Sequence, residues 1–160
     1  PIIERETFMP KKNLIFTLIF CAFTLPPLFG ATVSCLVIET GPPGGAKNQY
    51  SAMWENNLMD VFFDTGHIVS NARMIRLDRK PAENFPGAAE KDYQDAKANG
   101  MDYFLIALVE QNQNVSLRLF NTKSQELIKE QVYAYSVPKN AREENEKIKS
   151  AISLIAAHIR

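Results

Sequence analysis

Cysteine is scarce in this sequence, which has only Cys21 and Cys35 among its 160 residues. Cys21 lies within an apolar amino-terminal run, so a processed chain would keep Cys35 alone. One cysteine excludes an intrachain disulfide framework. About 130 residues would remain after processing, which is enough for one domain with one ordinary hydrophobic core.

The sequence also has no excess of charge. Its 18 basic and 18 acidic residues give a formal net charge of zero, and no basic patch stands out. Nucleic acid and anionic membrane surfaces are therefore poor candidates for binding partners. Neither His67 nor His158 has a cysteine or a second histidine at metal-ligand spacing. We therefore expect no zinc site and no cofactor.

The glycine-rich stretch 41–48 lacks the features of a phosphate-binding loop. Such a loop needs glycine just before its lysine and serine or threonine just after it, but Lys47 is flanked by alanine and asparagine. The phosphate cradle is built from backbone N–H groups, and Pro42 and Pro43 have none. This pattern argues against nucleotide binding.

The amino terminus carries the most specific pattern in the chain. A short basic region over 9–12 precedes an apolar stretch from Leu14 to Leu25, which Pro26 and Pro27 end. The small residues at 30–31 suit cleavage. This layout is typical of a secretory signal peptide, because the apolar stretch is too short for a comfortable membrane span.

The domain boundaries follow from that signal. We expect residues 1–8 to be an upstream extension, 9–31 to be the signal peptide and 32–160 to form a single domain. We therefore expect a periplasmic or otherwise exported protein. An uncleaved anchor, which would tether the domain to a membrane through its amino terminus, is the alternative.

Cys35 ends a loose version of a bacterial lipoprotein box, with serine before it but no leucine three places back. Acylation there would also tether the protein to a membrane. However, Cys35 lies within the predicted strand 33–40, and a lipidated residue normally needs a flexible leash before the fold begins. We therefore favour a buried cysteine over a lipid anchor.

The stretch from Tyr103 to Val109 is an unbroken apolar run of strand length, rich in aromatic and branched residues. Asn99 and Gly100 before it stop a helix, because both tolerate the left-handed conformation. A strand that is apolar on both faces must be covered. We therefore predict that this stretch is the central strand of the sheet.

Periodicity and turn residues place the other elements around this strand. The strand at 67–77 is less regular and is expected near an edge. The strand at 115–120 alternates apolar and polar residues, so we expect it to be half-exposed. The predicted strands are 33–40, 67–77, 103–109, 115–120 and 126–137, and the predicted helices are 47–65, 88–98 and 140–159. The fold class is therefore α/β (α+β), a single domain with a five-stranded mixed sheet in the order β-α-β-α-β-β-β-α.

This order resembles the amino-terminal domain of the translocation protein TolB and, more distantly, the envelope lipoproteins CsgG and LpoB. The resemblance covers about 33–160 and rests on the phrase VSLRLFNTKS at 115–124 and the small-residue turn at 96–103. The sequence departs from that group in the Gly-Pro-Pro-Gly-Gly loop after its first strand. The resemblance implies a non-enzymatic cell-envelope module that binds a partner protein as an accessory or assembly factor.

Two alternatives to this function remain open. Glu39 and Glu110 end two predicted strands, where an α/β sheet can border a ligand crevice, and His67 could act as a base. If these three side chains converge in one pocket, a small hydrolase or ligand-binding enzyme becomes the better hypothesis. The other alternative is a structural subunit of an envelope assembly, which predicts a homo-oligomer.

The predicted partner-binding surface combines the loop at 41–45 with the start of the helix that follows it. The loop is poor in side chains and partly stiff, so it can keep a fixed shape at little entropic cost. Tyr50 and Trp54, on the following helix, would supply apolar contact area. The alternative is that both side chains pack inward. The candidate residues are Gly41, Pro42, Pro43, Gly44, Gly45, Tyr50 and Trp54.

Overall fold

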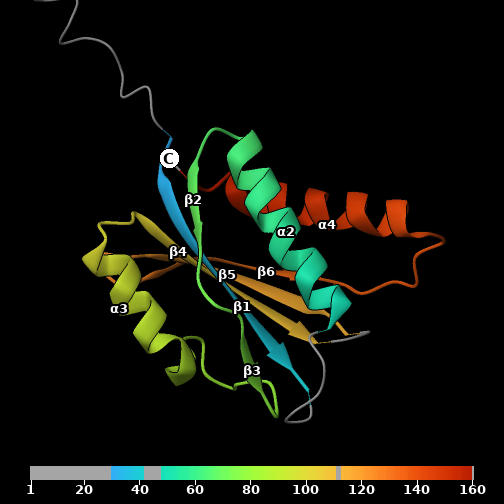
Figure 1. Cartoon of the computed structure of the whole chain (residues 1–160), viewed down its shortest axis with the longest axis horizontal. Helices are drawn as coiled ribbons and strands as arrows, with labels where there is room; N and C mark the ends of the chain where they lie inside the picture. The colour runs from blue at the N-terminus through green and yellow to red at the C-terminus, as the bar shows by residue number, and fades with distance from the viewer. Residues whose placement is uncertain (1–29, 42–47, 111–112, 160) are drawn as a thin grey trace, which may run out of the picture.

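The protein is a three-layer α/β/α domain, seen here in a computed structural model that describes residues 30–41, 48–110 and 113–159 (Figure 1). The helices α2 (Gln49–Asp64) and α4 (Ala141–Ala156) cover one face of a mixed sheet. The 3-10 helix η1 (Gly87–Ala89) and the helix α3 (Glu90–Ala98) cover the other face. This agrees with the predicted fold class.

The sheet has the strand order β2-β1-β4-β5-β6, with β3 also paired to β1. Strand β1 is parallel to β2, β3 and β4, whereas β4, β5 and β6 form an antiparallel meander. β4 is therefore the central strand, as its apolar run predicts. The strands are β1 (Thr32–Thr40), β2 (Ile68–Asn71), β3 (Ile75–Leu77), β4 (Tyr103–Glu110), β5 (Val115–Asn121) and β6 (Leu127–Tyr133).

The predicted strand 67–77 does lie at an edge, but it is two short strands rather than one. Cys35 is opposite Asn71, whereas Ile38 is opposite Ile75, so one extra residue is inserted between β2 and β3. The extra residue shifts the alternation of side chains between the two faces of the sheet. A one-residue bulge of this kind explains why the pattern is irregular in the sequence.

Both faces of β1 and β4 are buried, as predicted. From β1, Val33, Cys35 and Val37 point toward α2 and α4, whereas Leu36 and Ile38 point toward α3. Because each face packs against its own helical layer, the two central strands are apolar on both sides.

The prediction that β5 is half-exposed is wrong. Ser116 and Arg118 are only 2% and 7% exposed. The segment between β3 and η1 folds over them, and Arg118 Nη1 donates hydrogen bonds to the carbonyl oxygens of Glu83 and Asn84 at 2.8 and 3.1 Å. The polar positions of the alternating pattern therefore lie in a buried, hydrogen-bonded network rather than in solvent.

The α-helices begin close to their predicted first residues, but α4 ends earlier than predicted. Asn140 caps α4 by accepting a hydrogen bond from the Glu143 N–H at 2.9 Å. Gly66, with φ of 85°, follows α2 in the left-handed region. Helix α4 ends at Ala156, so His158 lies beyond it and not in its last turn.

The predicted strand 126–137 is also shorter than expected and ends at Tyr133. The backbone N–H of Tyr135 donates to the side chain of Asn114 at 2.9 Å and not to a neighbouring strand. None of the helices in the described parts of the chain has both the length and the apolar composition needed to cross a membrane.

Candidate functional site

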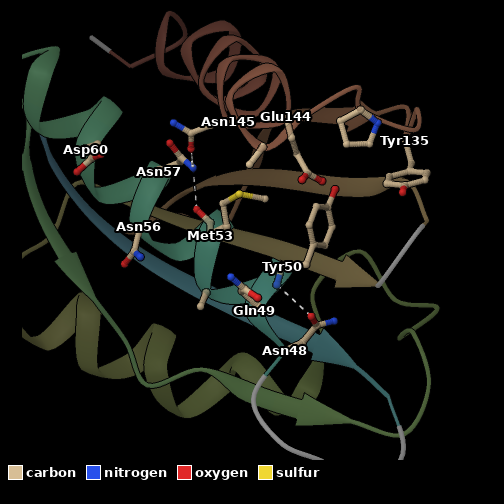
Figure 2. Close-up of a pocket in the computed structure, with 13 residues that line it drawn as sticks. Asn48, Gln49, Tyr50, Met53, Asn56, Asn57, Asp60, Tyr135, Glu144 and Asn145 are labelled. Carbon is tan, nitrogen blue, oxygen red and sulfur yellow. Dashed lines mark hydrogen bonds between the residues drawn. The ribbon is translucent and has the colours of Figure 1, made fainter.

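A groove of about 640 Å³ lies between the amino-terminal halves of α2 and α4 (Figure 2). We call it the α2–α4 groove. The connection between β6 and α4 forms its third side. Its walls carry amide, tyrosine and carboxylate side chains, among them Asn48, Gln49, Tyr50, Asn56, Asn57, Asp60, Tyr135, Glu144 and Asn145.

One end of the groove is fixed by the start of α2. The side chain of Asn48 caps the helix by accepting a hydrogen bond from the Tyr50 N–H at 3.0 Å. The N–H of Asn48 donates in turn to Glu39 Oε2 at 3.2 Å, and the Glu39 carboxylate is ion-paired with Arg76. The ends of β1 and β3 and the start of α2 are therefore held together around one buried carboxylate.

The two helices are joined inside the groove by a pair of amides. Asn57 on α2 is only 3% exposed. Its Nδ2 donates hydrogen bonds to Asn145 Oδ1 on α4 at 2.7 Å and to the Met53 carbonyl at 2.8 Å. A buried amide without partners would destabilise the fold, so this bridge fixes the spacing of the groove walls.

A row of aromatic rings supports the groove from beneath. Tyr135, Tyr50, Trp54 and Tyr133 make successive edge-to-face contacts, with ring centroids 6.4, 6.4 and 5.4 Å apart. Burial raises the pKa of Tyr50, and the nearby Trp54 side chain offsets this in part. The Tyr50 hydroxyl and the Trp54 indole N–H are buried without hydrogen-bond geometry to any described group.

The groove has no basic side chain among its lining residues, which include five amides and the carboxylates of Asp60 and Glu144. Such a surface suits a neutral or cationic polar ligand, because amides both donate and accept hydrogen bonds. It also has no cysteine, serine or histidine that could act as a nucleophile or base. The arrangement can bind, but it carries no recognisable catalytic pair.

The three residues of the enzyme hypothesis do not converge. Ile68 lies opposite Thr32 at the start of β1, so His67 is at the opposite end of the sheet from Glu39, about 26 Å away along the strand. Glu110 is opposite Thr40. Because side chains alternate along a strand, Glu39 and Glu110 point to opposite faces of the sheet. The predicted site at these three residues is therefore wrong.

His67 has a structural environment instead. Its ring packs against Phe62 with centroids 6.1 Å apart, and burial lowers its pKa. Its Nδ1 is buried without a hydrogen-bond partner among the described groups. Within the described residues, no group of three or more histidine, cysteine, aspartate or glutamate side chains is placed to hold a metal ion.

The structure describes only some of the predicted partner-binding residues. Pro42, Pro43, Gly44 and Gly45 lie outside the described residues, so the role of the loop stays a prediction. Trp54 is fully buried and packs inward, which is the alternative stated for it above. Tyr50 is half-buried and lines the α2–α4 groove, which begins directly after the loop.

Cys35 lies in the core between β1 and the helices, 1% exposed, as expected for a strand cysteine. Burial raises the pKa of its thiol well above the ordinary value, because the thiolate would be poorly solvated there. The prediction of a buried Cys35 is confirmed, and its side chain is free of any disulfide.

The sequence analysis missed the amides of the groove. Asn57 falls between Trp54 and Leu58 on the apolar stripe of α2, and a polar residue in such a stripe is a signal that could have been used. Asn145 gave no comparable signal, because it lies in a polar stretch of α4. Their pairing depends on how the two helices pack.

Comparison with known proteins shows a likeness of fold alone. No protein-family model matches the chain, and no curated protein matches it. Among solved structures, a point variant of the PelC dodecamer from Paraburkholderia phytofirmans matches with a TM-score of 0.50 and 15% identity, over 84% of this chain and 94% of that one.

Two further matches bear on the predicted resemblance. TolB from Acinetobacter baumannii is 17% identical with a TM-score of 0.42, over 80% of this chain but only 27% of TolB. The LpoB C-terminal domain from Escherichia coli is 14% identical with a TM-score of 0.44, over 76% of this chain and 94% of that domain. Both of these proteins, which the predicted resemblance names, are thus among the solved structures that match this chain.

Proposed function

We propose that this chain is an exported, non-catalytic module of the cell envelope that binds a partner protein through the α2–α4 groove. The observation that carries the proposal is the groove itself. It is bordered by two helix amino termini, its spacing is fixed by the Asn57–Asn145 bridge, and its lining has no basic side chain.

The chemistry of the groove favours an extended peptide segment as the ligand. Side-chain amides can satisfy both the N–H and the C=O groups of a peptide backbone, and Asn48, Gln49 and Asn56 line the wall. Tyr50 and Tyr135 add flat apolar contact area, and Glu144 favours a basic residue in the segment. The Asp60 carboxylate already lies 3.4 Å from Lys149 Nζ. An acidic segment would be repelled.

The envelope location is supported by two independent features. The amino-terminal sequence has the layout of a signal peptide. The fold is also like that of solved envelope proteins, which agrees with the resemblance found in the sequence. A non-catalytic role is supported by the separation of Glu39, Glu110 and His67.

The test is capture of a partner from the native envelope by the tagged full chain. Asn56→Arg places a long cation in the groove at an exposed position, so it should reduce capture at least tenfold without unfolding the domain. Gln94→Arg, at an exposed position of α3 on the other face, is the matched control and should capture normally. Equal capture by both variants would rule out the groove.

A further inference from the structure

We propose that β6 pairs with β6 of a second copy of this chain, which forms a two-fold symmetric dimer with one continuous sheet. This surface is separate from the α2–α4 groove, because no β6 residue lines that groove. Self-association through β6 would therefore use a different surface from partner binding.

β6 is an open edge of the sheet. It is the last strand of the sheet in the described residues, and its other side pairs with β5. Outside that ladder, residues 127–133 make no backbone hydrogen bond to any described group. A free row of N–H and C=O groups is a template for pairing with another strand.

The opposite edge of the sheet is less suitable. β2 has four residues and β3 has three, and the inserted residue between them breaks the ladder. β6 has seven residues in a row. Of the two edges that the structure describes, only β6 offers a single strand of the length usual for a strand pair. Its own pairing with β5 has one irregularity, opposite Leu119 and Phe120.

β6 also exposes apolar side chains. Val132 is 56% exposed and Ile128 is 39% exposed, although both are branched apolar residues typical of strand interiors. They lie two positions on either side of Glu130. Exposed branched residues at such spacing along an edge are unusual in a strand that has only solvent beside it.

The sequence of β6 is also complementary to itself. In an antiparallel pair centred on Glu130, Ile128 of each copy lies opposite Val132 of the other. Two apolar cross-strand pairs then form, one on each side of the two-fold axis. Lys129 lies opposite Gln131 of the second copy, so the two lysines avoid each other.

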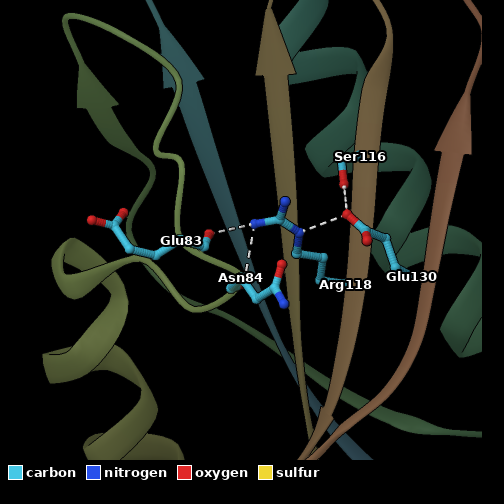
Figure 3. A network of polar contacts seen from close by, with 5 residues as sticks. All are labelled: Glu83, Asn84, Ser116, Arg118 and Glu130. Carbon is cyan, nitrogen blue, oxygen red and sulfur yellow. Dashed lines mark hydrogen bonds and ion pairs between the residues drawn. The ribbon is translucent and has the colours of Figure 1, made fainter.

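The centre of this pairing brings the two Glu130 side chains together, and each copy compensates its own carboxylate. Arg118 Nε donates to Glu130 Oε1 at 2.8 Å, and the Ser116 hydroxyl donates to the same oxygen at 2.9 Å (Figure 3). The charge is therefore already paired and turned toward β5.

Other registers are less favourable. Centring the pair on Lys129 would place the two lysines opposite each other, and centring it on Gln131 would place Glu130 opposite Val132. The irregular pairing of β5 and β6 near Leu119 and Phe120 also bends this end of the strand. These features limit β6 to one closed pair and not to open-ended aggregation.

The test begins with the oligomeric state of the purified full chain by analytical ultracentrifugation. We expect a concentration-dependent dimer, and Val132→Lys should weaken it at least tenfold because it places a cation against Ile128 of the second copy. Phe63→Lys is the matched control, since Phe63 is 74% exposed on α2 and away from β6. A monomer at all concentrations, or equal weakening by both variants, would overturn the proposal.

Disulfide cross-linking tests the register itself. In a Cys21→Ser background, protein with Ile128→Cys mixed with protein carrying Val132→Cys should form a mixed disulfide dimer on mild oxidation. Each protein alone should cross-link much less, because directly opposite residues lie within disulfide reach whereas others do not. Cys35 is buried and does not compete.

Absence of the mixed disulfide in a dimer that forms normally would overturn the β6 register. Asn56→Arg, the groove variant, should leave dimerisation unchanged, so failure of the dimer and failure of the groove are distinguishable. A strand of another protein on β6 would appear as a monomeric pure chain, which also counts against the second copy as the occupant.

Discussion

The Asp102 carboxylate, just before β4, accepts two hydrogen bonds from Thr32 at the start of β1. The Thr32 backbone N–H and hydroxyl both donate to Asp102 Oδ2, at 3.0 and 2.8 Å. The Asp102 N–H donates back to the Thr32 hydroxyl at 2.9 Å. These bonds stabilise the ionised form and hold the pKa of Asp102 below its ordinary value.

Asp102→Asn should therefore lower the free energy of unfolding by about 2 kcal/mol at neutral pH, because hydrogen bonds to a charged group are the stronger ones. Because the pKa of Asp102 is lower in the folded protein than in the unfolded one, its carboxylate stabilises the fold at pH values above the ordinary aspartate pKa. This contribution is lost as the pH falls through the lower pKa of the folded state. Urea denaturation from pH 7 to pH 2 should show the two proteins converging in stability at the acid end.

Asp95→Asn, at an exposed position of α3, is the control for the loss of a carboxylate. At pH 7 it should lower the free energy of unfolding much less than Asp102→Asn does. If Asp102→Asn were as stable as the unmodified chain at pH 7, the clamp to Thr32 would make no contribution to stability.

A second prediction concerns Arg118, which links β5 to β6 and to the segment before η1. Arg118→Met should lower the free energy of unfolding by about 2 kcal/mol, because it removes the donor to two carbonyl groups and leaves Glu130 with the Ser116 hydroxyl alone. The ion pair is partly open to solvent, with Glu130 37% exposed at its side chain, so we expect less than for a fully buried pair.

Hydrogen exchange separates this effect from general loss of packing. Residues 78–86 should exchange faster in Arg118→Met, whereas β1 and β4 should change little. Arg142→Met is the control, because Arg142 pairs with Glu146 at the surface and such pairs contribute little. Unchanged exchange in 78–86 would contradict the role of Arg118 in holding that segment.

These networks mark the limit of what the sequence predicts. The run from Tyr103 to Val109 identifies the central strand because burial on both faces requires apolar residues at every position. The same reasoning fails for β5, because Ser116 and Arg118 are polar but buried. Their partners, Glu130 and the carbonyls of Glu83 and Asn84, come from two other segments, and no local pattern reports them.

The candidate site shows the same limit. Tyr50 was predicted as part of a binding surface and does line the groove. The opposing wall comes from α4, and Asn57 and Asn145 are 88 positions apart. Trp54 and Tyr50 share a helix stripe in the sequence, but Trp54 is covered by side chains from distant segments, Tyr133 among them.

A third prediction follows from that bridge between the helices. Asn57→Ala and Asn145→Ala should each destabilise the domain, the first by about 2 kcal/mol because Asn57 is buried and the second by less. The double variant should cost about 1 kcal/mol less than the sum of the two, since both single changes break the same hydrogen bond. Strict additivity in thermal or urea denaturation would show that the two amides are not coupled.

The last prediction concerns the loop that precedes the groove. Gly41 N–H donates to the Leu77 carbonyl at 2.9 Å, and Asn48 N–H donates to Glu39, so both described ends of the loop are held by the sheet. Replacing Pro42, Pro43 and Gly44 with three serines should therefore leave the free energy of unfolding within about 0.5 kcal/mol of its original value. It should nevertheless weaken partner capture severalfold, because a looser loop loses more entropy on binding. Capture and urea denaturation of the same protein check both parts. If capture were unchanged in a stable fold, the loop would not belong to the binding surface, and the groove walls alone would have to account for recognition.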